Sequence, residues 1–122
     1  MKLSRKQLGH IGEKEALKLL LNKGYKLIEK NFRCPLGEVD LIMKEGDELV
    51  FIEVRSRTCR AFGEAFETVN LKKQNKLYKL GEYYLQFNGL EDVLCRFDVV
   101  SLLLTPGGEI KEGEHIENAF GM

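Results

Sequence analysis

Residues 37–57 of the chain are GEVDLIMKEGDELVFIEVRSR. Two runs within this stretch, residues 39–44 and 49–55, are rich in β-branched and large apolar side chains, which is typical of strands. The polar residues 45–48 between them include a glycine and predict a hairpin with a four-residue loop. A loop at that place sets the register, because residue 44 then pairs with residue 49 and each earlier residue with a later one. The stretch therefore predicts an antiparallel hairpin.

The two faces of this hairpin differ in character. One face is wholly apolar and must be buried; it consists of Val39, Leu41, Met43, Val50, Ile52 and Val54. The other face places Asp40 directly opposite Glu53, with Cβ atoms about 4.5–5.5 Å apart. Like charges at that distance destabilise a sheet unless protonation, a neighbouring cation or a metal ion offsets them, and a divalent ion held by oxygen ligands suits the pair. Alternatively, both carboxylates are exposed and are neutralised by Arg55 and Lys44.

The segments on either side of the hairpin predict a single α/β domain over residues 1–122. Apolar periodicity predicts helices over residues 4–22 and 70–88, the first capped by Ser4 with Gln7 three residues later. Strands are expected over 25–32 and 94–104, and a short edge strand is expected after a turn at 106–108. The expected architecture is a mixed β-sheet with a central hairpin flanked by two main helices.

Composition favours a cytoplasmic protein with no membrane partner. No apolar run approaches the roughly 20 residues of a membrane helix, and no apolar segment follows the basic N-terminus as in a secretory signal. The three cysteines are widely spaced, which indicates neither a disulfide framework nor a zinc site. The net charge is zero, but residues 34–54 carry one basic and six acidic residues between two basic segments. That pattern is compatible with solvated surface or with a carboxylate site flanked by phosphate-attracting surface.

Several ordered motifs along the chain resemble one known family. They are Gly12-Glu13 in the first helix, residues 37–42 (GEVDLI), residues 51–57 (FIEVRSR), Lys73-Gln74 in the second helix, residues 96–100 (RFDVV) and His115-Ile116. Together they resemble the YraN family of uncharacterised bacterial proteins, which is assigned to the PD-(D/E)xK, or restriction-endonuclease-like, superfamily. The resemblance implies a restriction-endonuclease-like core.

The resemblance also implies a mechanism and a set of catalytic residues. In enzymes of that superfamily, an Asp and a Glu on adjacent strands bind Mg²⁺ or Mn²⁺, which activates water and stabilises charge on the scissile phosphate. The matching positions are Asp40 and Glu53, with Glu13 completing the cluster. The third motif residue is usually Lys but is Arg55 in this chain, and arginine cannot act as a base. Arg55 is therefore expected either to hold a phosphate or to mark a weakened activity; its alternative is an ion pair with Glu38.

Basic residues around these motifs are candidates for nucleic-acid contacts. On the second helix, Lys72, Lys73 and Lys76 follow helical spacing and could track a phosphate backbone. Arg33 and Arg57, together with Asn31 and Arg60, are expected to contact phosphates near the site. A solvated face is the commoner meaning of such a stripe. His115 is interpreted as a packing residue of the tail.

Three functional hypotheses follow from these observations. The first is a metal-dependent nuclease acting on nucleic acid, with DNA favoured over RNA and with a homodimer compatible with cutting two strands. The second is a non-catalytic nucleic-acid-binding module on a nuclease fold, in which Arg55 has silenced catalysis. The third is an adaptor that uses the fold for protein contacts, which zero net charge permits.

Overall fold

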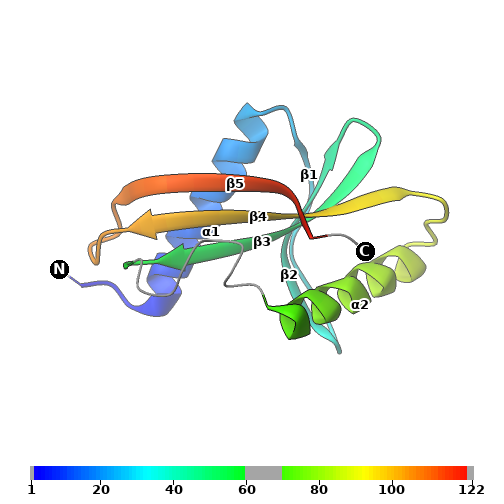
Figure 1. Ribbon diagram of the computed structural model, residues 1–122, viewed down its shortest axis with the longest axis horizontal. Helices are drawn as coiled ribbons and strands as arrows, with labels where there is room; N and C mark the ends of the chain where they lie inside the picture. Colours follow the sequence, from blue (N-terminus) through cyan, green and yellow to red (C-terminus); the bar gives the residue numbers. More distant parts are fainter. Residues whose placement is uncertain (1, 60–69, 121–122) are drawn as a thin grey trace.

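The predicted hairpin lies at the centre of a five-stranded sheet in the computed structural model, which describes residues 2–59 and 70–120 (Figure 1). Its strands are β2 (Gly37–Glu45) and β3 (Glu48–Arg57). The predicted register is confirmed from Lys44↔Leu49 to Leu41↔Ile52. The loop differs from the prediction, because Glu45 also pairs with Glu48 and leaves a two-residue turn. Gly46 has φ 57° there, which suits the tight turns that join two strands.

The remaining strands extend the sheet on both sides of the hairpin. Strand β1 (Lys26–Cys34) pairs with β2, and the sheet order is β1-β2-β3-β4-β5. Strand β4 (Leu94–Leu104) is parallel to β3, and β5 (Ile110–Phe120) pairs antiparallel with β4. The mixed sheet is thus confirmed. The edge strand β5 is longer than predicted, because pairing with β4 orders a tail whose exposed polar residues show no clear strand alternation.

One helix covers each face of the sheet. Helix α1 (Arg5–Asn22) begins with the predicted Ser4–Gln7 capping box, and α2 (Leu71–Phe87) begins at Asn70, whose side chain accepts from the Lys73 backbone N–H. Buried residues of α1 pack against Leu41, Met43, Val50 and Ile52, whereas those of α2 pack against Ile42, Leu49 and Phe51. Both faces of the hairpin are therefore buried. No helix in the described part of the chain is long and apolar enough to cross a membrane.

Helix α1 approaches β3 closely at Gly12. A Cβ atom at Gly12 would lie 1.8 Å from Ser56 Oγ and 3.1 Å from Ser56 Cβ. Gly9, one turn earlier on the same helix, has open space at the corresponding position. Gly12 therefore sets the distance between α1 and the end of β3.

Gly12→Ala is expected to destabilise the protein by about 1–3 kcal/mol, because the new methyl group overpacks the helix–strand contact. The matched variant Gly9→Ala should instead stabilise it by about 0.5–1 kcal/mol through helix propensity. Urea unfolding followed by circular dichroism compares the two. Adding Ser56→Ala should return part of the loss, because Ser56 Oγ has no hydrogen-bond partner among the described residues. Equal stability of the two alanine variants would contradict the assigned contact.

Candidate functional site

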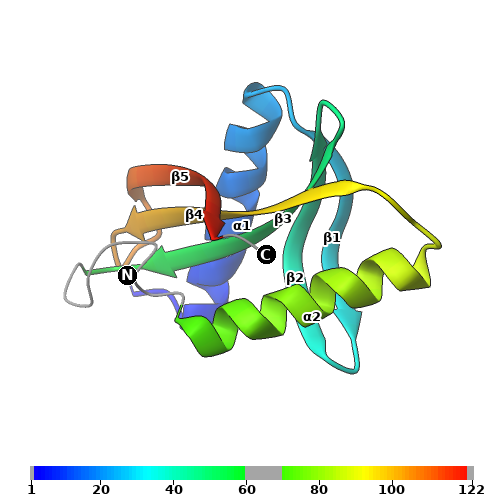
Figure 2. The ribbon, with the colours of Figure 1, turned by 45° about the vertical axis from the view of Figure 1, so that its right-hand side comes forward.

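The sheet forks where β2 leaves β3. The ladder between these strands ends at Leu41↔Ile52, whereas β3 stays paired with β4 as far as Arg57↔Leu103. Figure 2 shows β1 and β2 turning away from β3 beyond this point. Asp40 lies at the fork, and its Oδ2 accepts a hydrogen bond from the Val54 backbone N–H at 2.8 Å. The predicted Asp40–Glu53 backbone pair is thus replaced by a side chain that caps the strand beyond the last ladder pair.

The two predicted acidic residues interact at this fork. Glu53 is only 8% exposed, and Asp40 is partly buried. Burial raises the pKa of Asp40 to about 7, and the nearby charge of Glu53 adds to the rise. The Val54 N–H opposes this change, and the charges of Glu13 and Glu38 reinforce it. The groups around Asp40 therefore do not fully compensate the negative charge that gathers at the fork.

Two cations lie beside Glu53. Lys73 Nζ of α2 is 3.4 Å from Glu53 Oε1, and Arg55 Nη1 is 3.8 Å from the same oxygen. The predicted alternative pair of Arg55 with Glu38 is not made, because Glu38 pairs instead with Arg33 Nε at 3.3 Å. The structure therefore brings Arg55 of β3 and Lys73 of α2 to the carboxylate pair.

Glu13 of α1 joins the same acidic group. Burial raises the pKa of Glu13, Glu38 adds to the rise, and the charge of Glu53 contributes further, whereas His10 and Arg33 oppose it. With its amide oriented to satisfy both partners, Asn31 Nδ2 donates to Glu13 Oε1 at 2.8 Å and to Glu38 Oε1 at 2.9 Å. Asn31 has φ 53°, a conformation that Asn adopts more readily than most residues. The sequence predicted Asn31 as a phosphate contact but not as a bridge between Glu13 and Glu38, because no local pattern shows which side chains it will join. Arg60, predicted beside it, lies outside the described residues.

The carboxylates at the fork suit a hard divalent cation whose other ligands come from water and substrate. Among residues 2–59 and 70–120, no three His, Cys, Asp or Glu side chains gather closely enough to hold an ion by themselves. Asp40 and Glu53 supply two carboxylates. Mg²⁺ commonly binds through one or two carboxylates, with water and substrate phosphate filling its other positions. The residues present therefore fit Mg²⁺ or Mn²⁺ as a shared site completed by substrate.

The other residues predicted to contact nucleic acid are spread over β1 and α2. Arg33, Lys72 and Lys76 are exposed. The stem of Lys76 lies over Gly37, where a Cβ atom would be 2.9 Å from Lys76 Cε. Of the three lysines, only Lys73 forms an ion pair with a carboxylate of the fork. Lys72 is exposed on α2, and no contact with another described residue assigns it to the site.

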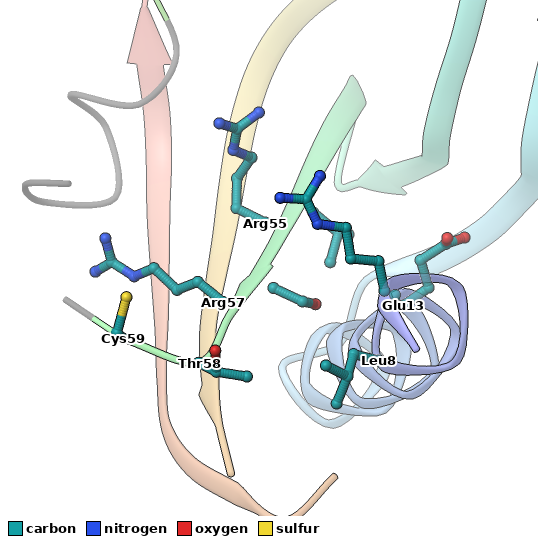
Figure 3. A pocket seen from close by; sticks show the side chains of 10 residues that line it. Leu8, Glu13, Arg55, Arg57, Thr58 and Cys59 are labelled. Atoms are coloured by element: carbon teal, nitrogen blue, oxygen red, sulfur yellow. The ribbon is translucent and has the colours of Figure 1, made fainter. Parts of the chain in front are cut away.

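Arg57 lies in a pocket of about 600 Å³ between α1 and the end of β3. We call it the arginine pocket, because Arg5, Arg55 and Arg57 line it; the other lining residues are Leu8, Gly9, Glu13, Val54, Ser56, Thr58 and Cys59. Figure 3 shows Arg55 and Arg57 projecting from β3, with Glu13 on α1. Arg55 and Glu13 belong both to this pocket and to the surroundings of the carboxylate pair. Arg5 was not singled out from the sequence, because its helix position carries no motif.

A second polar cluster is buried near the other end of the hairpin. Asp98 of β4 is fully buried and accepts hydrogen bonds from Arg96 Nε at 3.1 Å, Tyr25 Oη at 3.1 Å, His115 Nε2 at 2.8 Å and the Asn118 backbone N–H at 2.9 Å. Burial alone would raise the pKa of Asp98, but these hydrogen bonds outweigh it and lower the pKa. The His115 side chain is 1% exposed. Its interpretation as a packing residue is thus extended, because it is also part of a polar network.

Known proteins of similar sequence match this chain over almost its whole length. The sequence model of the uncharacterised protein family UPF0102 matches residues 12–102. A UPF0102 protein of Moorella thermoacetica is 43% identical over 98% of this chain and 100% of its own length. One from Desulforamulus reducens is 45% identical over 98% of this chain and 100% of its own length. One from Thermodesulfovibrio yellowstonii is 47% identical over 97% of this chain and 99% of its own length.

Proposed function

The chain belongs to the UPF0102 family of uncharacterised proteins, and from the geometry of its fork we propose that it is a metal-dependent phosphodiesterase acting on nucleic acid. Mg²⁺ or Mn²⁺ is the proposed cofactor, and DNA is the favoured substrate. The proposal includes a restriction-endonuclease-like core. The order of elements and the acidic fork between β2 and β3 support that assignment.

One observation carries the proposal: two carboxylates from adjacent strands meet where the sheet opens. A purely structural pair would be expected to be neutralised, because burying a charge without a partner is unfavourable. Glu53 has Lys73 and Arg55 beside it, but Asp40 has a pKa raised to about 7 by burial and by Glu53. A residue whose pKa is perturbed by burial and by a specific charged neighbour is a candidate for function.

Each side chain at the fork has a distinct proposed task. Asp40 and Glu53 hold the metal ion, and Glu13 adds negative charge from α1. Arg55 and Lys73 bind the phosphate being cleaved, since both already reach Glu53. Arg55 stays protonated and so cannot accept a proton from water. When bound, the metal ion supplies Lewis acidity, which activates water and stabilises negative charge on the phosphate.

The first test is metal binding followed by cleavage. Calorimetric titration of Mn²⁺ and Mg²⁺ is expected to show binding to the wild type and none to Asp40→Asn or Glu53→Gln. Wild-type protein should then cleave members of a panel of duplex, branched and single-stranded DNA only when the metal ion is present. Both variants should lose this activity, because each removes one of the two carboxylate ligands.

The matched control is Asp47→Asn, which neutralises an exposed carboxylate at the turn of the same hairpin, away from the fork. It should bind metal and cleave DNA as the wild type does. DNA cleavage that persists in Asp40→Asn prepared free of contaminating nucleases would overturn the proposal.

Arg55 distinguishes catalysis from binding alone. If the wild type retains DNA in a salt-sensitive and metal-independent way but cuts none of the substrates, the chain is a binding module. Arg55→Lys then shows whether the site has been silenced, because lysine restores a compact amine that can shift its pKa on burial. Cleavage gained by Arg55→Lys would identify Arg55 as the silencing change. Failure of both proteins to retain nucleic acid would favour the adaptor hypothesis.

A further inference from the structure

Asn31 of β1 joins two of the acidic side chains near the fork. In the orientation that satisfies both partners, its Nδ2 donates to Glu13 Oε1 of α1 at 2.8 Å and to Glu38 Oε1 of β2 at 2.9 Å. An amide NH2 group has two hydrogens, so these two bonds use both of them. Two carboxylates that approach one nitrogen this closely repel each other, and the shared donor offsets that repulsion. The amide of Asn31 therefore determines how Glu13 and Glu38 meet.

Glu38 is itself held through its other oxygen. Arg33, its cross-strand partner in the ladder of β1 and β2, has its Nε 3.3 Å from Glu38 Oε2. A chain of contacts thus runs from the β1–β2 ladder through Glu38 and Asn31 to Glu13 on α1. Asn31 is the link in this chain between the strands and the helix.

Asn31 also lies next to the proposed metal ligands. The residues on either side of Asn31 pair with those on either side of Asp40, so these two residues face each other across β1 and β2. Burial, the charge of Glu53 and then the charge of Glu13 raise the pKa of Asp40. The Glu13 carboxylate is therefore close enough to act electrostatically on the carboxylate pair.

We propose that Asn31 is a positioning residue of the metal site, which acts by holding the Glu13 carboxylate at the fork. The inference rests on the proposed function and adds to it the group that keeps the acid of α1 in place. Without the amide, Glu13 turns away from Glu38, and the negative charge available to a cation at Asp40 and Glu53 falls. The sequence predicted a phosphate contact for Asn31, whereas this role commits both of its amide hydrogens to carboxylates.

Calorimetric titration with Mn²⁺ alone, in the absence of DNA, tests this role. Asn31→Gly removes the amide, and glycine accepts the φ of 53° at this position without strain. This variant is expected to weaken Mn²⁺ binding about fivefold, because one hydrogen bond to a charged group is lost. The matched control is Asn118→Gly on β5, where φ is 48° and the backbone N–H that donates to Asp98 is kept. It should bind Mn²⁺ as the wild type does.

A double-mutant cycle shows whether Asn31 acts through Glu13. Glu13→Gln should weaken Mn²⁺ binding by a similar factor. Adding Asn31→Gly to it should weaken binding no further, because the group that the amide positions is already neutral. A direct contact of Asn31 with substrate phosphate would instead leave Mn²⁺ binding unchanged and raise KM for an oligonucleotide. That result, or two factors that multiply in the double variant, would overturn the role of Asn31.

Nuclear magnetic resonance of the metal-free protein separates this inference from the proposed function. Glu13→Ala should shift one side-chain amide proton of Asn31, and Glu38→Ala should shift the other, because each variant removes one acceptor. Amide protons that ignore both variants would contradict the bridge. If both shifts are seen but the wild type neither binds Mn²⁺ nor cleaves DNA, the proposed function fails, whereas Asn31 still holds Glu13. If Mn²⁺ binding and cleavage depend on Asp40 but not on Asn31, the proposed function stands and the positioning role fails.

Discussion

Asp98→Ala is expected to lower the free energy of unfolding by about 3–5 kcal/mol, because it removes the acceptor on which a buried charged network converges. Its loss would leave the buried Arg96 without its main partner and would remove the acceptor from His115 Nε2. Arg96 keeps its contacts with Glu45 at 2.7 Å and Glu48 at 3.4 Å, both at the hairpin turn. The network thus ties β4 and β5 to the hairpin, and one substitution disturbs all three.

Urea unfolding at pH 7 measures this loss, with Glu91→Ala as an exposed acidic control. Tyr25→Phe removes the hydroxyl that donates to Asp98 and accepts from Arg96 Nη2, and should lose about 1.5–3 kcal/mol. Because the pKa of Asp98 is lowered in the folded protein, its contribution is present above the unfolded value of 3.8 and is lost as the pH falls below it. An Asp98→Ala protein as stable as Glu91→Ala at pH 7 would refute the role of the network.

Asp40→Asn is expected to stabilise the metal-free protein at pH 8 by about 2–3 kcal/mol, allowing for the solvent that reaches this partly buried group. The pKa of Asp40 rises from 3.8 to about 7 on folding, so the folded protein holds the proton to higher pH than the unfolded chain does. Wild-type stability should therefore fall as the pH rises from about 4 to about 7. Asparagine carries no charge at any of these pH values and keeps an oxygen for the Val54 N–H.

Urea unfolding of both proteins in EDTA, at pH 5 and at pH 8, checks the sign. The difference between the proteins should be clearly smaller at pH 5 than at pH 8, because at pH 5 only part of the range from 3.8 to about 7 has been crossed. Adding Mg²⁺ at pH 8 should stabilise the wild type selectively, by the amount that binding to the folded state provides. If the difference in unfolding free energy between the two proteins does not change with pH, the charge of Asp40 does not destabilise the folded protein.

The sequence was sufficient to predict the hairpin and its register because the polar residues 45–48 mark where the two apolar runs are joined, and the position of the turn decides which residues pair. Both faces of the hairpin are buried, so the apolar pattern alone would not have chosen between registers a residue apart. The turn was predicted too long, because the pairing of Glu45 with Glu48 depends on a positive φ at Gly46 rather than on apolar alternation. Local patterns thus define the strands better than the turn that joins them.

The acidic residues of the candidate site could be predicted from the sequence, but the contacts of the residues around them could not. Asp40 and Glu53 interrupt apolar runs, which made them visible, and the resemblance added Glu13. The contacts of Asn31, Lys73 and Arg5 depend on how α1, β1 and α2 meet around the fork, which no local spacing encodes. The network around Asp98 was missed for the same reason, because its members come from segments far apart in the chain.

The strand order has a consequence for how the chain folds. Three of the four strand pairings join strands that follow each other directly, but β3 and β4 pair in parallel across residues 58–93. Closing that long loop is the largest single entropic barrier among these pairings, so we expect it to dominate the folding rate. The hairpin can form by local contacts alone, yet β3 beyond the fork is held in the sheet by β4. Glu53 and the arginines that follow it are therefore fixed in place only after the slowest contact has formed.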